Sequence, residues 1–516
     1  MTGGREFACR ARGRLGGAPA ICYPRTMLVN SRARLRKPPQ MLAADAIRAA
    51  VAVVTMAVAH DAIAAAPSGE LLVERGMELA LVWGIPFAGL LLSIALLPLV
   101  ASDFWHRHYG KVAAAWAIAF VVPFTIRYGF ATTVHDVAHV ILLEYVPFVV
   151  ILFALFTIAG GICLRGILVA SPALNTGLLA LGAALASVMG TTGASMVLIR
   201  PLLTANAGRK HQVHVVVFFI LLVGNVGGAL SPLGDPPLFI GFLKGVDFFW
   251  TTRVLALPTA FLVCALLAMF WLLDHRLCAH EVVSVSPASE HPPLALEGGL
   301  NLLLIAGVIG AVLLSGLWRS GIAFEVLGVE LHLENVVRDL LLLALAGVSL
   351  ALTPAAIRQH NQFHWTPITE VAKLFAGIFI TIIPVLAMLA AGHAGALANV
   401  IGIVTDAPGN PREIAVFWMA GLLSAFLDNA PTYLVFFNLA GGDAERLMGP
   451  LANALAALSM GAVYFGALTY IGNAPNFMIK AIAEDRGVKM PSFLGYTAYA
   501  AVPMLPLLVV VSLLFV

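Results

Sequence analysis

The sequence predicts an all-α protein that crosses a membrane many times, and three observations support this prediction. Of the 516 residues, 60% are hydrophobic and only 11% are charged, whereas a soluble domain has about 25% charged residues. The mean hydropathy is +0.94, and the apolar residues gather in long runs that suit spans of about 20 residues. So few charges cannot make the solvated surface of a cytosolic enzyme, a nucleic-acid binder or a disordered scaffold.

The first 66 residues differ from the rest of the chain. Residues 1–40 form a basic tail, with nine Lys and Arg against a single acid, and we expect this tail to be disordered. Residues 41–66 combine a short basic start, an apolar stretch and a small-residue end, which is typical of a signal sequence or of a first transmembrane helix. The sequence leaves these two alternatives open, as it leaves open which methionine is the start.

The remaining chain divides into two membrane parts. We expect a first membrane repeat over 77–273, a cytoplasmic linker over 274–299 and a second membrane repeat over 300–516, because the polar stretch around the linker interrupts the apolar pattern. Each part holds six apolar runs. They lie near 77–101, 110–131, 137–161, 173–204, 212–245 and 250–273, and near 300–317, 338–353, 368–391, 411–440, 450–484 and 494–516.

The two parts also repeat each other in sequence. The segment GALSPLGDPPLF at 228–239 aligns with GALTYIGNAPNF at 466–477 at an offset of 238 residues. At an offset of 237, the small polar cluster at 190–195 lies over the cluster at 427–432. Each half therefore carries two polar interruptions inside apolar runs.

These interruptions predict how each half is built. Non-helical backbone in lipid leaves amides and carbonyls without partners unless it lines a site, and such breaks are a good sequence pointer to a transport site. We expect 173–204 and 411–440 to be re-entrant helical hairpins, and 212–245 and 450–484 to be helices broken at mid-membrane. Each half then crosses five times, which makes the second half an inverted repeat of the first. Since basic loops favour the cytoplasmic side, the N-terminus and the linker are expected in the cytoplasm and the C-terminus outside.

Two carboxylates, Asp235 and Asp428, lie in these interruptions. A charged aspartate at the bilayer centre costs at least about 2.5 kcal/mol, so a functional role is the first interpretation. The alternative is a structural role as helix N-caps. With the neighbouring polar groups, they make up the candidate ion- or substrate-binding set: Thr191, Thr192, Ser195, Asn225, Gly234, Asp235, Asp428, Asn429, Thr432, Gly472 and Asn473.

If each hairpin tip meets the broken helix of its own half, two sites result with one carboxylate each. The first would hold Thr191, Thr192 and Ser195 with Asp235, and the second Asn429, Thr432 and Asn473 with Asp428. One negative charge among neutral oxygens suits a monovalent cation. Because burial disfavours the charged carboxylate, the same group can also hold a proton. Competition between the two ions would give antiport, and neither a cofactor nor a bound metal is expected.

Two other features have weaker functional interpretations. His135 and His139 have a spacing that would let them share a metal, but they lie at the entrance of a span, where interfacial histidines are common. Glu144 lies inside a span, where it would belong to a proton path or reach the nearby interface.

The motifs GNVGGALSPLGDPPLFIGFLKGVDFFW, FLDNAPTYLVFF and YIGNAPNFMIKAIAE resemble the ion transporter superfamily, which contains arsenite pumps, citrate and dicarboxylate carriers and NhaD-type sodium:proton antiporters. They look most like the antiporter branch that is also labelled as citrate transporters. The resemblance begins near residue 77 and implies a homodimer in the bacterial inner membrane. It also implies a scaffold domain and a mobile transport domain that moves as an elevator.

The hairpin tips depart from those of the carboxylate carriers, which resemble Ser-Asn-Thr. Here the second tip places Asp428 where an anionic substrate would lie. We therefore expect a transporter and not an enzyme, with Na⁺/H⁺ exchange ranked first and cation-coupled uptake of citrate or a dicarboxylate second. Arsenite or another solute comes next. An intramembrane aspartyl protease is a remote alternative, because Pro232 stands where the Gly-x-Gly-Asp motif of those enzymes requires glycine.

Overall fold

The computed structural model describes residues 74–166, 168–279, 281, 295–406 and 410–516. The predicted tail over 1–40 and the signal-like segment over 41–66 lie outside these residues. Within the described part, nine helices are long and apolar enough to cross a membrane, and a tenth span results if the bent pair α15 and α16 is counted as one. The prediction of an all-α, polytopic membrane protein is therefore confirmed.

The helices of the first half follow the predicted runs closely. They are α3 (Ile85–Val100), α4 (Ser102–Tyr128), α5 (Phe130–Val140), α6 (Val146–Ala159), α7 (Pro172–Met189), α8 (Thr191–Ala205), α9 (Val213–Leu222), α10 (Pro236–Leu243) and α11 (Trp250–Ala279). A π-helical turn at Ile141–Tyr145 joins α5 to α6. Helix α11 continues past Asp274, where the sequence places the start of the linker. This aspartate is buried and accepts hydrogen bonds from Asn175 on α7 and from Arg209, between α8 and α9.

The helices of the second half include more short ones than those of the first half. They are α12 (Gly299–Leu317), α13 (Leu333–Leu352), α14 (Ala355–His360), α15 (Thr366–Thr381), α16 (Ile383–Ala390), α17 (Ala398–Val404), α18 (Glu413–Leu427), α19 (Asn429–Leu439), α20 (Ala444–Met448), α21 (Ala452–Phe465), α22 (Ala474–Asp485) and α23 (Phe493–Phe515). The bend between α15 and α16 is 42°.

Two small antiparallel sheets lie outside the helices, and the sequence pattern did not predict them. Strand β1 (Cys163–Arg165) pairs with β2 (Ala295–Glu297), and β3 (Ala323–Val326) pairs with β4 (Val329–His332) in a hairpin. The first sheet joins the segment that follows α6 to the segment that precedes α12. An ion pair between Arg165 and Glu297, at 3.1 Å, links its two strands.

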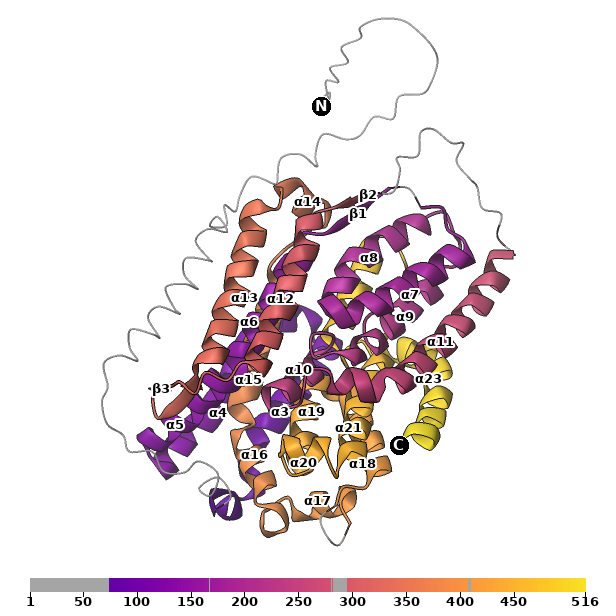
Figure 1. Ribbon diagram of the computed structural model, residues 1–516. Helices are drawn as coiled ribbons and strands as arrows, with labels where there is room; N and C mark the ends of the chain where they lie inside the picture. The colour runs from indigo at the N-terminus through magenta and orange to yellow at the C-terminus, as the bar shows by residue number, and fades with distance from the viewer. Residues whose placement is uncertain (1–73, 167, 280, 282–294, 407–409) are drawn as a thin grey trace, which may run out of the picture. The chain divides into compact units, whose positions relative to one another are not determined.

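The helices pack in two groups (Figure 1). In one group, α12 and α13 lie side by side against α6, and α3 and α4 pack with α15. In the other, α7 packs against α8, α9 and α11, while α18 packs against α19 and α21. Helix pairs α7–α8 and α18–α19 form helical hairpins at the two predicted places, and that each re-enters on one side of the membrane stays a prediction.

Each hairpin turns at one residue with a positive φ. Gly190 between α7 and α8 has φ 81° and ψ 150°, and Asp428 between α18 and α19 has φ 85° and ψ 140°. Gly190 and Asp428 are therefore structural equivalents, at an offset of 238 residues. This corrects the sequence alignment of the clusters by one position, so that Thr191 corresponds to Asn429 and not to Asp428.

The two broken helices share the same offset. Ser231 donates its hydroxyl to the Ser187 carbonyl, and Thr469 donates to the Ala425 carbonyl at 2.5 Å. Both breaks depend on close glycine contacts. A Cβ on Gly234 would lie 2.0 Å from the Gly228 carbonyl oxygen, and a Cβ on Gly472 would lie 2.6 Å from the Gly466 carbonyl oxygen. These matches support a structural repeat; that the second half is inverted across the membrane stays a prediction.

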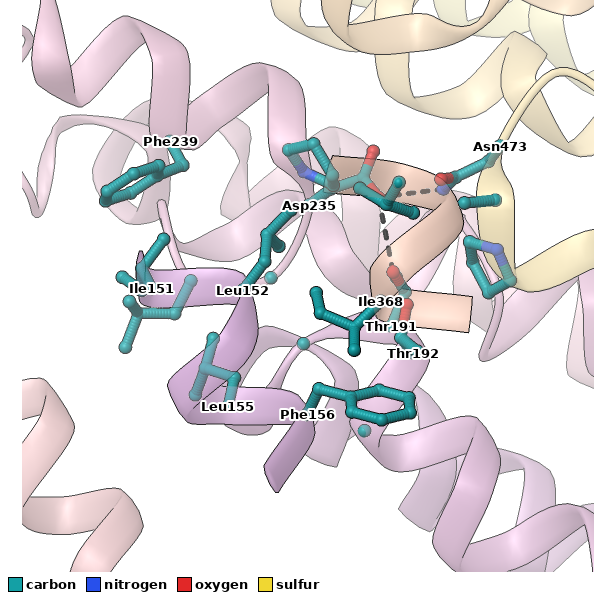
Figure 2. Close-up of a pocket in the computed structure, with 18 of the residues that line it drawn as sticks. Ile151, Leu152, Leu155, Phe156, Thr191, Thr192, Asp235, Phe239, Ile368 and Asn473 are labelled. Atoms are coloured by element: carbon teal, nitrogen blue, oxygen red, sulfur yellow. Dashed lines mark hydrogen bonds between the residues drawn. The ribbon is translucent and has the colours of Figure 1, made fainter. Parts of the chain in front are cut away.

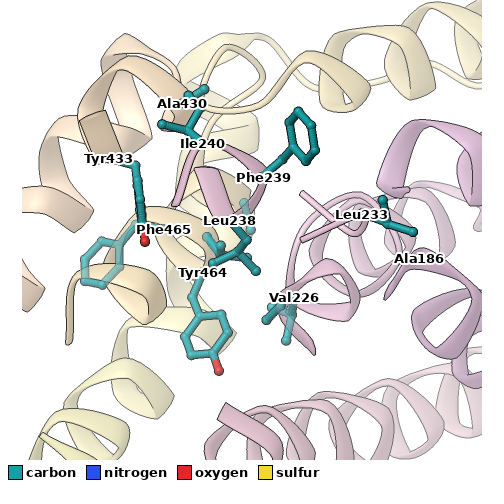
Figure 3. Packing of buried hydrophobic residues seen from close by; sticks show 14 of the residues in the cluster. Ala186, Val226, Leu233, Leu238, Phe239, Ile240, Ala430, Tyr433, Tyr464 and Phe465 are labelled. Atoms are coloured by element: carbon teal, nitrogen blue, oxygen red, sulfur yellow. The ribbon is translucent and has the colours of Figure 1, made fainter. Parts of the chain in front are cut away.

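The breaks are held by a continuous apolar core (Figure 3). Leu238 and Ile240 on α10 lie near Tyr433 on α19 and Phe465 on α21, and α10 packs against both of these helices. A Cβ on Gly241 would meet the Tyr433 hydroxyl at 2.5 Å, so this glycine permits the close approach of α10 and α19. The short helix that follows Asp235 is thus fixed against the second half.

Candidate functional site

Four helices begin at the predicted site. Helices α8, α10, α19 and α22 start directly after Gly190, Asp235, Asp428 and Asn473, which are their N-cap residues. A helix N-terminus presents backbone N–H groups without intrahelical partners and the positive end of the helix dipole. In each half, one of the two N-caps is an aspartate.

Asp235 is the centre of the polar contacts (Figure 2). Its residue is 1% exposed, and its Oδ1 accepts hydrogen bonds from the Asn473 amide at 2.8 Å and from the Thr191 hydroxyl at 3.3 Å. Its Oδ2 accepts a hydrogen bond from the Asn429 amide at 2.5 Å. The carboxylate makes no capping bond to its own helix, so capping does not explain its position.

The three donors come from both halves of the chain. Thr191 and Asn429 are equivalent residues of the two hairpin tips, and Asn473 is the counterpart of Asp235 in the second broken helix. The sequence led us to expect two separate sites, each confined to its own half. The structure instead brings these groups together at one carboxylate, because the two hairpin tips and the two breaks meet.

Asp428 has a different role in the backbone. Its Oδ1 accepts a hydrogen bond from the Ala430 N–H at 3.2 Å, as an N-cap does, and its residue is half-buried. The Thr432 hydroxyl donates to the Asp428 carbonyl at 2.8 Å, so this threonine is used within its own helix. Asp428 nevertheless lines the same cavity as Asp235.

Four oxygen atoms of the predicted set have no hydrogen-bond partner among the described residues. They are Ser195 Oγ, Asn225 Oδ1, Asn429 Oδ1 and Asn473 Oδ1, and all four are buried. The position that a Cβ of Gly466 would occupy lies 3.1 Å from both Asn225 Oδ1 and the Gly472 carbonyl oxygen. Neutral oxygens of this kind suit hard cations.

The site opens into a cavity of about 90 Å³. The polar lining comes from the hairpin tips and breaks, namely Thr191, Thr192, Asp235, Asp428 and Asn473, with the Gly234 backbone among them. Helices α6 and α15 form the opposite wall with apolar side chains, including Leu152, Phe156 and Ile368 (Figure 2). The lining contains no Lys, Arg or His.

Backbone and side-chain hydrogen bonds hold the hairpin tips and the breaks in place. The Thr191 N–H donates to the Gly234 carbonyl at 2.9 Å, which joins the first hairpin to the first break. Asn225 donates to the Ile220 carbonyl at 2.8 Å and to Asn476 Oδ1 at 2.7 Å, which joins the two breaks.

The remaining candidates lie apart from this cavity. Glu144, in the π-helical turn, forms an ion pair with Lys244 at 2.5 Å, and Lys244 is the residue that ends α10. The rings of His135 and His139 are 6.4 Å apart. Among the described residues, no group of three or more His, Cys, Asp or Glu is arranged to hold a metal ion.

Sequence reasoning missed two parts of the site and one ion pair that lies apart from it. Asn476 lies within the aligned motif, and its polar side chain in an apolar run was a usable signal. Lys244 ends a predicted run, but nothing local indicated its partner. The apolar wall of α6 and α15 carried no signal, since its residues look like those of any membrane span.

Comparison with known proteins agrees with this architecture. The family described as putative citrate transport matches residues 76–516, and the chain belongs to this family. Comparison with curated proteins gave no match. The chain is therefore a multi-pass membrane protein and a secondary transporter.

Proposed function

We propose that this transporter exchanges Na⁺ for H⁺ at the site around Asp235 and Asp428. The observation that carries the proposal is the environment of Asp235, a carboxylate that is 1% exposed and hydrogen-bonded by three neutral side chains. A buried carboxylate normally needs a positive partner. No basic side chain lines the cavity, so a transported cation or a proton would be the partner.

The surrounding oxygens support the binding of a cation. The unpartnered oxygens of Asn429 and Asn473 provide neutral ligands near one negative charge, since both side chains contact Asp235. Either Na⁺ or H⁺ can neutralise the carboxylate, but not both at the same oxygen. Exchange follows if the part of the protein that carries the site moves across the membrane least readily when its carboxylate is empty and charged.

Asp428 would contribute a second negative charge to the same cavity. Its carboxylate is partly used for capping, so we assign the main carrier role to Asp235. Asp428 then makes the cavity more attractive to cations and repels a free carboxylate substrate.

Cation-coupled uptake of citrate is the second candidate. The family description favours it, and so do the four helix N-termini at the cavity, since helix N-termini attract anions. The two aspartates oppose it, because a citrate anion would first need bound cations to offset their charge. We therefore rank it below ion exchange.

One experiment separates the two functions. Proteoliposomes that contain the purified protein and a trapped pH-sensitive dye are given Na⁺, Li⁺, K⁺ or citrate outside. Antiport predicts that external Na⁺ drives protons out and makes the lumen alkaline. Uptake of radioactive citrate that depends on the cation, with no Na⁺-driven proton efflux in its absence, would refute the exchange proposal.

The assembly and location follow as proposals from the family resemblance. We propose a homodimer in a bacterial cell membrane, with α7–α11 and α18–α23 moving against α3–α6 and α12–α15. Cross-linking in native membranes and vesicle-sidedness assays test the oligomeric state and the orientation.

A further inference from the structure

The ion pair between Glu144 and Lys244 connects two helices that face each other across the cavity. Helix α10 begins directly after Asp235 and ends at Lys244, its C-cap. Helix α6 follows directly after the π-helical turn that contains Glu144. Phe239 on α10 and Ile151 on α6 both line the cavity (Figure 2). Because Lys244 Nζ lies 2.5 Å from Glu144 Oε1, the far end of the Asp235 helix is tied to the start of the apolar wall.

The π-helical turn also contacts α15, the other helix of the wall. Tyr145, next to Glu144 in this turn, donates its hydroxyl to the Ala372 carbonyl on α15 at 2.9 Å. Turns of this kind are rare and are found frequently at functional sites. One short turn therefore links α6, α10 and α15, which all contribute to the cavity lining.

This ion pair has a special place among those that the described residues form. It alone joins α3–α6 or α12–α15 to α7–α11 or α18–α23, since both partners of every other pair belong to the same one of these two groups or to the segments beside it.

Stability alone does not account for this ion pair. Glu144 is 6% exposed, and its Oε2 is buried without a hydrogen-bond partner. Burying an ion pair costs about as much as it gains, and apolar residues of similar volume often stabilise a protein as well or better. A role in holding the geometry of the two helix groups accounts for the pair.

Helix α10 is short enough to transmit this restraint to the ion site. Its eight residues span about 12 Å at about 1.5 Å per residue. The helix ends sharply, because Gly245 follows Lys244 with φ 101°. Asp235 makes no side-chain bond to its own helix, so the position of its carboxylate depends on how α10 as a whole is held. Binding sites need their ligands held within about 0.5 Å, so a loosened Lys244 end would affect Asp235.

We propose that Glu144 is a positioning residue for the ion site, which acts through Lys244 and α10 to hold Asp235 in its place beside the apolar wall. Glu144 itself contacts no transported ion. This inference rests on the proposed function in one respect only, namely that Asp235 takes Na⁺.

The test separates cation affinity from the amount of folded protein. Na⁺/H⁺ exchange in proteoliposomes gives the apparent KM and the maximal rate, and Na⁺-dependent stabilisation of the purified full-length protein against heat gives the dissociation constant. Glu144→Gln should raise the KM and the dissociation constant for Na⁺ by about three- to tenfold. The maximal rate per folded protein should stay near that of the parent. A purely structural role would instead lower the amount of folded protein and leave the KM unchanged.

A second variant and a control complete the test. Lys244→Met should act in the same way as Glu144→Gln. The double variant should be no weaker than the weaker single variant, because both changes break the same link. Glu334→Gln is the matched control, since Glu334 is 3% exposed and loses the same charge but lies on α13, outside the cavity lining. It should keep the parental KM.

The outcomes that overturn the inference differ from those that overturn the proposed function. An unchanged Na⁺ affinity in folded Glu144→Gln overturns the inference, and so do effects of the two single variants that multiply in the double variant. Na⁺/H⁺ exchange with unchanged Na⁺ affinity in Glu144→Gln refutes this inference alone. Weakened Na⁺ binding in Glu144→Gln, with a parent protein that does not exchange Na⁺ for H⁺, refutes the proposed function alone.

Discussion

Replacing Asp235 with asparagine removes one of the two carboxylates of the site while it keeps the shape of the side chain. Asparagine retains one acceptor oxygen for Thr191 and Asn473. Its new amide group faces Asn429, whose Oδ1 has no partner among the described residues, so a half-turn of the Asn429 amide restores a hydrogen bond. We expect the free energy of unfolding to change by no more than about 1–2 kcal/mol, because charge-assisted bonds become neutral ones.

The effect on Na⁺ binding should be much larger. Two unit charges about 4 Å apart attract by about 4 kcal/mol at an effective dielectric constant of about 20. Because each step of about 1.4 kcal/mol is a factor of ten, the loss corresponds to about a thousandfold in Na⁺ affinity. Asp428→Asn should have a smaller effect, since Asp428 already gives one oxygen to the Ala430 N–H and an asparagine caps a helix about as well.

The assay is Na⁺-driven proton movement in proteoliposomes, with protein level and oligomer size measured alongside. Asp247→Asn is the matched control, because Asp247 undergoes the same chemical change with a side chain that is 46% exposed. It should exchange at the parental rate. Exchange by Asp235→Asn at near the parental rate, in folded protein, would refute the role of this carboxylate and favour carboxylate symport.

Four further predictions address the rest of the chain. The apparent KM for Na⁺ should rise as pH falls, with the maximal rate less affected; a KM that is independent of pH would indicate separate proton and sodium sites. Lys244→Met should lower the free energy of unfolding by about 1–3 kcal/mol because it leaves the buried carboxylate of Glu144 without its partner, and in thermal unfolding Glu144→Gln should cost less. Gly466→Ala places a methyl group 3.1 Å from two site oxygens, so Na⁺ affinity should fall with little change in protein level; unchanged affinity would remove these oxygens from the site. Cysteines placed at Gly208 and Gly441 should be labelled from opposite sides of the membrane, and labelling from the same side would contradict the inverted repeat.

The local features of the site were predictable from sequence because they are local in origin. Polar clusters within apolar runs indicated both hairpins and both breaks, since unpaired backbone groups in lipid must line a site. The register of the hairpins was not predictable to the residue. Gly190 and Asp428 share one backbone conformation with positive φ, but glycine and aspartate do not resemble each other in an alignment.

The convergence of both halves on Asp235 could not be read from the sequence. Asn429 and Asn473 lie 194 and 238 residues away from it along the chain, and no periodicity encodes such a contact. The pairing of Glu144 with Lys244, 100 residues apart, is hidden for the same reason. What the sequence did show was that each of these polar groups was unusual in its apolar run.

The placement of the two aspartates supports the proposal of a cation site in this repeated scaffold. A helix N-terminus carries roughly half a positive charge, so the four that meet here sum to roughly two. With neutral caps throughout, this arrangement would attract anions. Aspartates occupy two of the four caps, Asp235 and Asp428, and the lining contains no Lys, Arg or His. The positive helix ends therefore help to stabilise two carboxylates beside an apolar wall. Under the proposed exchange, a single Na⁺ or H⁺ at Asp235 supplies the positive charge that the helix ends do not, so its gain or loss decides the net charge of the site.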